Sequence, residues 1–164
     1  MTEGAGETSP PDVVVIGVGN EMRGDDAAGI LAARLLRGQL DPGRVLVLEQ
    51  AGEALGLLDQ WEGFRAAVII DAIGAGLPAG SLHRHDASKA PLPADVHSST
   101  STHLVWVGES IELARAIGRL PPAVIVHGVQ GICFDTGAPL SEPVRGALDP
   151  LAERVRLEVD GLTK

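Results

Sequence analysis

Two aspartates and a histidine stand at positions where three segments of this sequence could bring them together. Asp26 follows a glycine-containing turn, Asp71 comes directly after the apolar run "AAVII", and His103 closes a stretch rich in serine and threonine. Carboxylate oxygens and an imidazole nitrogen can bind a divalent metal of borderline preference, such as zinc or nickel. Three protein ligands would leave coordination positions open for a substrate.

Each of these residues also has a purely structural interpretation. An acid at the end of a strand is often solvated or a cap, and a histidine after serines and threonines is often a surface or capping residue. Asp25, next to Asp26, is predicted to be the N-cap of the following helix, where its side chain would accept a backbone N–H. Asp26 would then complement the helix dipole from the first turn. For Asp26, the structural and the metal-binding interpretations stay open at this point.

The glycines before the two aspartates match a nucleotide-binding motif only in part. Gly17 and Gly19 fit G-x-G-x-x-G, but Met22 stands where the third glycine belongs. Gly24 is followed by Asp25 and not by the lysine of a phosphate loop. A helix N-terminus carries about half a positive charge and attracts anions. Because the aspartates already supply negative charge there, a phosphate would be repelled, and nucleotide binding is disfavoured.

Strand-like and helix-like segments alternate along the chain, which predicts an α/β fold with a mostly parallel sheet. Strands are expected at residues 13–16, at 44–49, within 66–73 and ending near Asp71, at 80–86 (an edge strand) and at 123–130 (a central strand). Helices are expected at residues 26–36 and 53–61, in the later part of 103–120, and in 140–159. The predicted fold class is a three-layer α/β/α arrangement, phosphorylase/hydrolase-like, with a mostly parallel, twisted five-stranded sheet flanked by helices.

Three features of this arrangement bear on the site. Residues 87–102, rich in Pro, Ser and Thr, are expected to form a long surface loop. Pro150 is expected to kink or restart the last helix at Asp149, and Ser141 is expected to be its N-cap. Ligands of open α/β sheets bind outside the carboxyl ends of the strands, near the switch point of the strand order. Asp26 and Asp71 both belong to that edge.

Composition excludes several classes of protein. The chain has 164 residues, enough for one domain, and a formal net charge of -9. It has no basic patch, so nucleic acid and anionic membrane surfaces are disfavoured as partners. No apolar run approaches the roughly 20 residues of a membrane span. Residues 1–11 lack the basic and apolar stretches of a signal peptide and are expected to be a disordered tail before a single domain of residues 12–164. We expect a cytoplasmic protein.

The remaining cysteine and histidines are weaker candidates. Cys133 is the only cysteine, which excludes a disulfide within the chain, and it is interpreted as a small apolar residue and not as a nucleophile. His83 and His85 would share one face of a strand. They could form a metal-binding pair, but a solvated position on an edge strand is the favoured interpretation. His97 is a weaker loop ligand than His103. His127 lies in an apolar run and is expected to be packed and hydrogen-bonded.

Four segments, in the same order, resemble the motifs of the hydrogenase maturation endopeptidases, nickel-dependent proteases that trim the large subunit of nickel–iron hydrogenases. They are "VIGVGNEMRGDDAAG" (15–29), "VIIDAI" (68–73), "SSTSTHLV" (98–105) and "VHGVQGICFDTGAPLSEPV" (126–144). The resemblance runs from about Asp12 to Glu158, nearly the whole chain. It implies that Asp26, Asp71 and His103 are the metal-binding and catalytic residues. Where the family often has Glu, this chain has the shorter Asp26.

The chain departs from the family pattern after the second strand. The family commonly has a "DGGT"-like turn, whereas this chain has "EQAGEALG" at residues 49–56. Glu49 falls at the acid position and Gly52 at the threonine position. The resemblance implies that this loop helps to recognise the substrate, and Glu49, Gly52 and Asn20 are the expected recognition residues.

The resemblance also implies a reaction and a partner. The substrate would be the precursor of the hydrogenase large subunit, from which one cut removes a C-terminal extension after nickel insertion. Nickel would arrive with that precursor, and zinc or cadmium could substitute for it at the two carboxylates and the histidine. A monomer is expected to dock transiently on its substrate. The alternative is a non-catalytic nickel- or metal-binding maturation module on the same fold.

Overall fold

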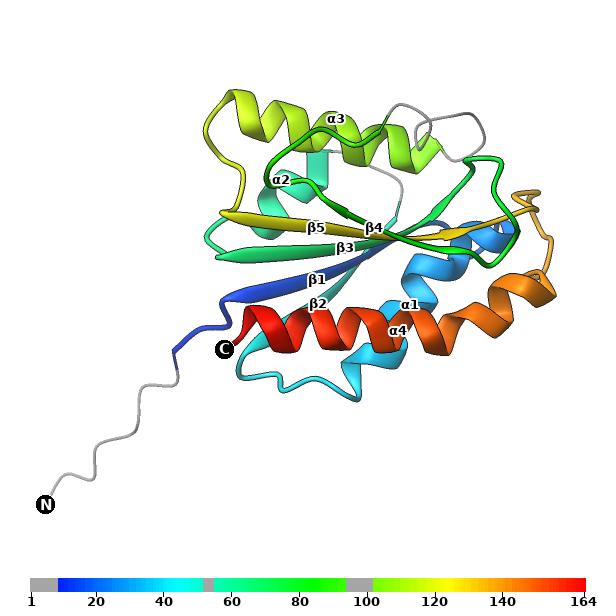
Figure 1. Cartoon of the computed structure of the whole chain (residues 1–164), viewed down its shortest axis with the longest axis horizontal. Helices are drawn as coiled ribbons and strands as arrows, with labels where there is room; N and C mark the ends of the chain where they lie inside the picture. Colours follow the sequence, from blue (N-terminus) through cyan, green and yellow to red (C-terminus); the bar gives the residue numbers. More distant parts are fainter. Residues whose placement is uncertain (1–8, 52–54, 94–101) are drawn as a thin grey trace, which may run out of the picture.

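The computed structural model describes residues 9–51, 55–93 and 102–164, with side chains for all of these except Leu55 and residues 102–106. Ten elements follow one another in these ranges (Figure 1). They are β1 (Val13–Val18), the 3-10 helix η1 (Gly24–Ala27), α1 (Ala28–Arg37), β2 (Val45–Gln50), α2 (Leu55–Trp61), β3 (Ala66–Ile73), β4 (Leu82–Asp86), α3 (Thr102–Ala116), β5 (Ala123–Gln130) and α4 (Glu142–Leu162).

The five strands form one sheet in the order β2-β1-β3-β5-β4. The first four are mutually parallel, and β4 pairs antiparallel with β5 at the edge. Helices α1 and α4 cover one face and α2 and α3 the other (Figure 1). The predicted three-layer α/β/α class is confirmed, as are the central position of β5 and the edge position of β4.

Alternation along each strand divides the apolar residues between two cores. From β1, Val13 and Val15 pack into the core beneath α1 and α4, whereas Val14 and Ile16 pack into the core beneath α2 and α3. Successive strand side chains point to opposite faces, so a strand covered on both sides is mostly apolar on both. This explains why β1 and β3 are buried along their whole length.

Helix α1 lies directly against the backbone of the sheet because Gly29 has no side chain. A Cβ added at Gly29 would lie 2.3 Å from the carbonyl oxygen of Val18 and 2.4 Å from that of Ile70. Any larger residue would push α1 away from β1 and β3. Close packing of α1 on the sheet therefore requires glycine at position 29, the last residue of the glycine-containing motif.

Two predicted helix starts were wrong, and of the two expectations for Pro150 the restart is absent. Residues 24–27 form the 3-10 turn η1 before α1 begins at Ala28. Helix α3 begins at Thr102, so His103 lies in its first turn and not in an irregular lead-in segment. Helix α4 continues past Pro150 without restarting. Pro150 is exposed, and the buried residues on the opposite face, before and after it, hold the helix against the sheet: Val144, Ala147, Leu151, Ala152, Val155 and Val159.

The strand order reverses between β1 and β3. From β1 the chain passes to β2 on one side and then crosses to β3 on the other. The carboxyl ends of β1 and β3 therefore flank the topological switch point, where ligands of this kind of sheet bind. The predicted N-terminal tail falls mostly on residues outside the described ranges. Within those ranges, none of the helices combines the length and the apolar character needed to span a membrane.

Candidate active site

Asp26 lies in η1, at the end of the loop that leaves β1. Its side chain is buried, with 1% of the residue exposed. The turn is closed by the backbone of Asp26: its N–H donates to the carbonyl of Arg23 at 3.1 Å, and its carbonyl accepts the N–H of Asn20 at 3.2 Å. The position of the Asp26 carboxylate is therefore determined by this short turn.

Asp71 lies near the carboxyl end of β3, opposite Gly128 of β5. It is fully buried, and its Oδ1 accepts the N–H of Ala72 at 2.8 Å. Its Oδ2 has no hydrogen-bond partner within the described part of the chain. Burial, and after it the negative charge of Asp26, raise the pKa of Asp71 well above its usual range, against the opposing effect of the Ala72 N–H.

The structure thus brings two of the three predicted ligands to the same place. Asp26 and Asp71 are buried acids on the two elements that flank the switch point. The backbone of His103 is in the first turn of α3, but its side chain lies outside the described residues. Among the described side chains, no three His, Cys, Asp or Glu residues form a group that could hold a metal ion. A three-ligand site stays a prediction that depends on His103.

Asp25 has a different role from the one predicted. The position before η1 is taken by Arg23, so Asp25 is not the N-cap of its own helix. Its buried carboxylate accepts hydrogen bonds from the loop after β5 and from Ser141 at the start of α4. Ser141 is the N-cap of α4 by position, as predicted, but its hydroxyl donates to Asp25 instead of capping its own helix.

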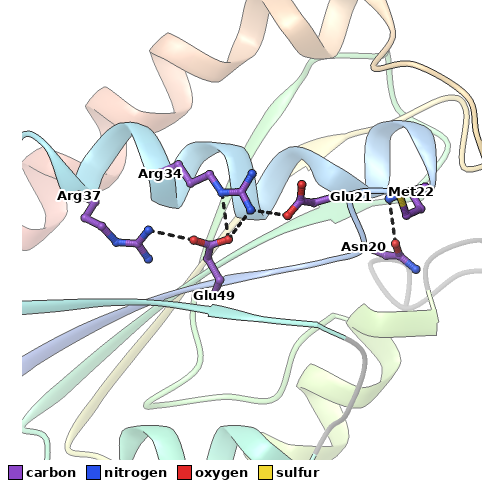
Figure 2. A network of polar contacts seen from close by, with 6 residues as sticks. All are labelled: Asn20, Glu21, Met22, Arg34, Arg37 and Glu49. Atoms are coloured by element: carbon purple, nitrogen blue, oxygen red, sulfur yellow. Dashed lines mark hydrogen bonds and ion pairs between the residues drawn. The ribbon is translucent and has the colours of Figure 1, made fainter.

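The predicted recognition residue Glu49 belongs to a network of charges that joins β2 to α1 (Figure 2). Its carboxylate accepts from Arg34 Nε at 3.0 Å and from Arg37 Nη1 at 2.9 Å. Arg34 also pairs with Glu21, in the loop before η1. These contacts hold the pKa of Glu49 below its usual range, mainly through Arg34. The carboxylate has 26% of its side-chain surface exposed, so a partner can still reach it.

Of the other two predicted recognition residues, only Asn20 is described. Its Oδ1 accepts the N–H of Met22 at 2.9 Å, which shapes the loop between β1 and η1 (Figure 2). Gly52 lies outside the described residues. His97, the weaker alternative to His103, lies outside them as well.

His127 is packed and hydrogen-bonded, as predicted. It is 2% exposed, and its Nε2 lies 3.2 Å from Glu158 Oε2 on α4. Arg84 donates to both oxygens of Glu158, at 2.6 and 2.9 Å, which holds the pKa of Glu158 below its usual range. Burial lowers the pKa of His127, although Glu158 opposes that shift.

Of the remaining candidates, His85 and Cys133 have polar contacts, whereas His83 Nε2 is buried and has no hydrogen-bond partner within the described part of the chain. His85 Nε2 lies 3.2 Å from the carbonyl oxygen of Ala90, at the edge strand β4 that also carries His83. Cys133 is half-buried in the loop after β5, and its Sγ lies 3.7 Å from Asp135 Oδ2. None of these positions lies on β1, η1 or β3, which carry the two buried acids.

The structure is an α/β protein with a buried acidic pair at the switch point of a mostly parallel sheet. A family model described as "Hydrogenase maturation protease" (HycI) matches residues 30–158 of the sequence. The chain belongs to this family of hydrogenase maturation proteases.

Individual relatives agree with the family model. The chain is 26% identical to the hydrogenase expression/formation protein HupD of Thiocapsa roseopersicina, over 88% of this chain and 66% of that protein. It is 27% identical to HoxM of Azotobacter vinelandii, over 90% of this chain and 72% of that protein. The chain thus spans about two thirds of the length of the first of these relatives and somewhat more of the second.

Solved structures share the fold. The hydrogenase maturating endopeptidase HybD from E. coli superposes with a TM-score of 0.80 at 22% identity, covering 91% of this chain and 92% of that one. The nickel–iron hydrogenase maturation protease HycI from Thermococcus kodakarensis gives a TM-score of 0.71 at 25% identity, with 94% of each chain covered. These similarities extend over nearly the whole described domain.

Sequence reasoning missed the contact between Asp25 and Ser141. Both residues carry ordinary capping signals, and each was assigned to the helix next to it. No local pattern links two positions that are 116 residues apart. The available signal was the presence of two adjacent acids in a turn that needs only one N-cap.

Proposed function

We propose that this protein is the endopeptidase that removes the C-terminal extension from the precursor of a nickel–iron hydrogenase large subunit, after nickel has been inserted. Family membership supports the reaction class. The observation that carries the site assignment is the pair of buried acids, Asp26 and Asp71, at the switch point, with Asp71 Oδ2 left without a hydrogen-bond partner in the described structure.

The burial of these two carboxylates is consistent with binding of a divalent cation between them. A buried charge is costly unless it is paired or bound to a metal, and here a second acid lies on the neighbouring element. A cation that met Asp71 Oδ2 and the Asp26 carboxylate would compensate both charges. His103, in the first turn of α3, would complete a set of two oxygens and one nitrogen, which suits nickel and also zinc or cadmium.

In this proposal the nickel belongs to the substrate. A bound divalent metal polarises a carbonyl or lowers the pKa of its water, and either effect would favour peptide hydrolysis. The residues of the chain itself would orient the precursor: Asp26 and Asp71 from the sheet edge, and His103 from α3. Asn20, Gly52 and Glu49 would contact the precursor around this centre. In this proposal the protein acts as a monomer and has neither nucleic acid nor a membrane as a partner.

The test is to mix the purified protein with its own precursor, once with nickel inserted and once without, and to measure the precursor mass. Loss of the C-terminal peptide only from the nickel-loaded precursor would support the proposal. His103→Ala and Asp26→Asn are each expected to lower the rate of cleavage by at least about a hundredfold. Both variants should keep the thermal unfolding transition of the wild type. Asp41→Asn, in an exposed turn of the α1–β2 loop, is the matched control.

Absence of cleavage with either precursor, while the chain still binds nickel, would favour the non-catalytic metal-binding module. Normal cleavage by both site variants would remove Asp26 and His103 from the site. The two results are distinct, because the first concerns the wild-type protein and the second only its variants.

A further inference from the structure

We infer that Asp25 is a positioning residue for the site: it ties the turn that carries Asp26 to the loop after β5, and so holds the Asp26 carboxylate in place. This inference rests on the proposed function, since it assigns a role within the same site. It assigns different roles to the two adjacent acids. Asp26 would face the metal, and Asp25 would face the protein.

The Asp25 carboxylate is fully buried and accepts four hydrogen bonds. Oδ2 accepts the N–H of Ile132 at 2.9 Å, the N–H of Cys133 at 3.2 Å and the hydroxyl of Ser141 at 2.9 Å. Oδ1 accepts the N–H of Ser141 at 2.7 Å. Hydrogen bonds to a charged acceptor are the strong ones, and these four come from both ends of the β5–α4 connection.

The backbone joins the same two segments. The N–H of Asp25 donates to the carbonyl of Cys133 at 2.8 Å, and the N–H of Gly137 donates to the carbonyl of Met22 at 2.7 Å. Gly24 has φ +55°, and a Cβ there would lie 2.4 Å from the Cys133 oxygen. The turn and the loop therefore fit closely against each other on both sides of Asp25.

Because of these contacts, Asp25 cannot serve as a metal ligand. It supports the proposed ligand Asp26 instead. A carboxylate has about four acceptor sites, and both oxygens of Asp25 are already engaged by protein donors. Asp26 is the next residue in the same 3-10 turn, so a shift of Asp25 moves Asp26 with it. Sites that bind metal or perform catalysis need their ligands held within about 0.5 Å by such supporting contacts.

The test compares Asp25→Asn, Ser141→Ala and the control Asp41→Asn. An asparagine at residue 25 has one acceptor oxygen, and its NH2 group would face donors in the loop. Ser141→Ala removes only the hydroxyl and keeps the three backbone donors. Asp41 accepts a backbone N–H, from Gly43 at 2.9 Å, in a loop at the opposite end of the sheet, so its substitution controls for loss of an Asp–backbone bond.

Three readouts are needed: the thermal unfolding midpoint, kcat and KM for the nickel-loaded precursor, and the affinity of the chain alone for Cd²⁺ by calorimetry. For Asp25→Asn, assayed well below its unfolding midpoint, we expect kcat to fall by at least about tenfold with KM within about twofold. We expect Cd²⁺ affinity to fall by a similar factor. The kcat and the Cd²⁺ affinity of Ser141→Ala should lie between those of Asp25→Asn and the wild type. Both quantities should be the same for Asp41→Asn as for the wild type.

A lower unfolding midpoint with wild-type kcat and wild-type Cd²⁺ affinity would overturn the inference, because Asp25 would then stabilise the fold alone. If Asp25→Asn does not fold, Ser141→Ala decides by the same readouts. If the wild-type protein does not cleave its precursor, the proposed function fails. The ratio of Cd²⁺ affinities between variant and wild type then still tests the positioning role.

Discussion

Asp71 and Asp26 are neighbouring buried acids, and the charge of Asp26 adds to burial in raising the pKa of Asp71. The protein keeps this unfavourable arrangement at the sheet edge where open α/β sheets in general bind ligands. Buried polar groups that lower stability are retained most often at functional sites. The relationship between these two residues therefore has consequences for stability as well as for activity.

Asp71→Asn is expected to abolish processing without loss of stability. The amide oxygen can still accept the Ala72 N–H, while the buried charge beside Asp26 is removed. We expect the free energy of unfolding at neutral pH to be unchanged or to rise by about 1 kcal/mol. Chemical denaturation and the mass-based cleavage assay measure the two effects.

The stability effect of Asp71→Asn has a definite pH dependence. Because the pKa of Asp71 is raised on folding, its contribution to stability is present below its ordinary value of 3.8 and is lost as the pH rises through the folded value. The stability of the variant relative to wild type should therefore increase from pH 4 towards pH 8. A constant difference over that range, or wild-type cleavage by the variant, would contradict this account.

His127 is expected to make the protein less stable in mild acid. Burial lowers its pKa on folding, so its contribution is present above its ordinary pKa of 6.5 and is lost as the pH falls towards the folded value. The groups that face it are Glu158, Arg84 and Arg154, and only Glu158 favours its charged form. Unfolding free energy should fall between pH 6.5 and pH 5, by at most about 1.4 kcal/mol per pH unit from this residue.

His127→Gln isolates this effect. Its amide nitrogen can replace Nε2 beside Glu158 but does not titrate. His85→Gln, on the edge strand, controls for the replacement of a histidine by glutamine elsewhere in the sheet. The wild-type and His85→Gln proteins should lose stability on acidification more steeply than His127→Gln. Parallel curves for all three would show that His127 carries no such effect.

Glu49→Gln is expected to have little effect on stability and more on recognition. Exposed ion pairs contribute about 0–1 kcal/mol, so loss of the pairs with Arg34 and Arg37 should lower the unfolding free energy by less than about 1 kcal/mol. If Glu49 contacts the precursor, KM should rise by about fivefold, or about 1 kcal/mol, with kcat unchanged. An unchanged KM would assign Glu49 to the contact between β2 and α1 alone.

Pro150→Ala is expected to stabilise the protein. Proline within a helix lacks the N–H that would donate to residue 146, and it costs about 3 kcal/mol relative to alanine in a helix interior. Proline also restricts the unfolded chain, which offsets part of this cost, so we expect a gain of roughly 1–2 kcal/mol in denaturant titrations. Asp149→Ala, also exposed, controls for helix propensity and should gain about 0.5 kcal/mol or less. Equal gains in both variants would contradict the effect assigned to Pro150.

Much of the fold followed from patterns within single segments. Strand β3 could be predicted within residues 66–73, because a strand buried on both faces is mostly apolar, but it was expected to end near Asp71 and it continues to Ile73. The alternation of elements predicted the mostly parallel sheet, and the edge position of Asp26 and Asp71 followed from the rule for ligand sites in such sheets. These features depend on periodicity and local chemistry, which a sequence displays directly.

The tertiary structure decided which partner each polar side chain takes. Asp25 and Ser141 each fit a local cap by type, and only the docking of the β5–α4 connection on η1 joins them. The family resemblance predicts that Glu49 contacts the substrate, but its pairing with Arg34 and Arg37 depends on how α1 crosses β2. Pro150 predicted a kink or a restart of the last helix, and α4 continues through it without a restart while its opposite face is buried. In each case a contact between distant segments outweighs a local preference, because burial and hydrogen bonding across the fold contribute more free energy than propensity within one element.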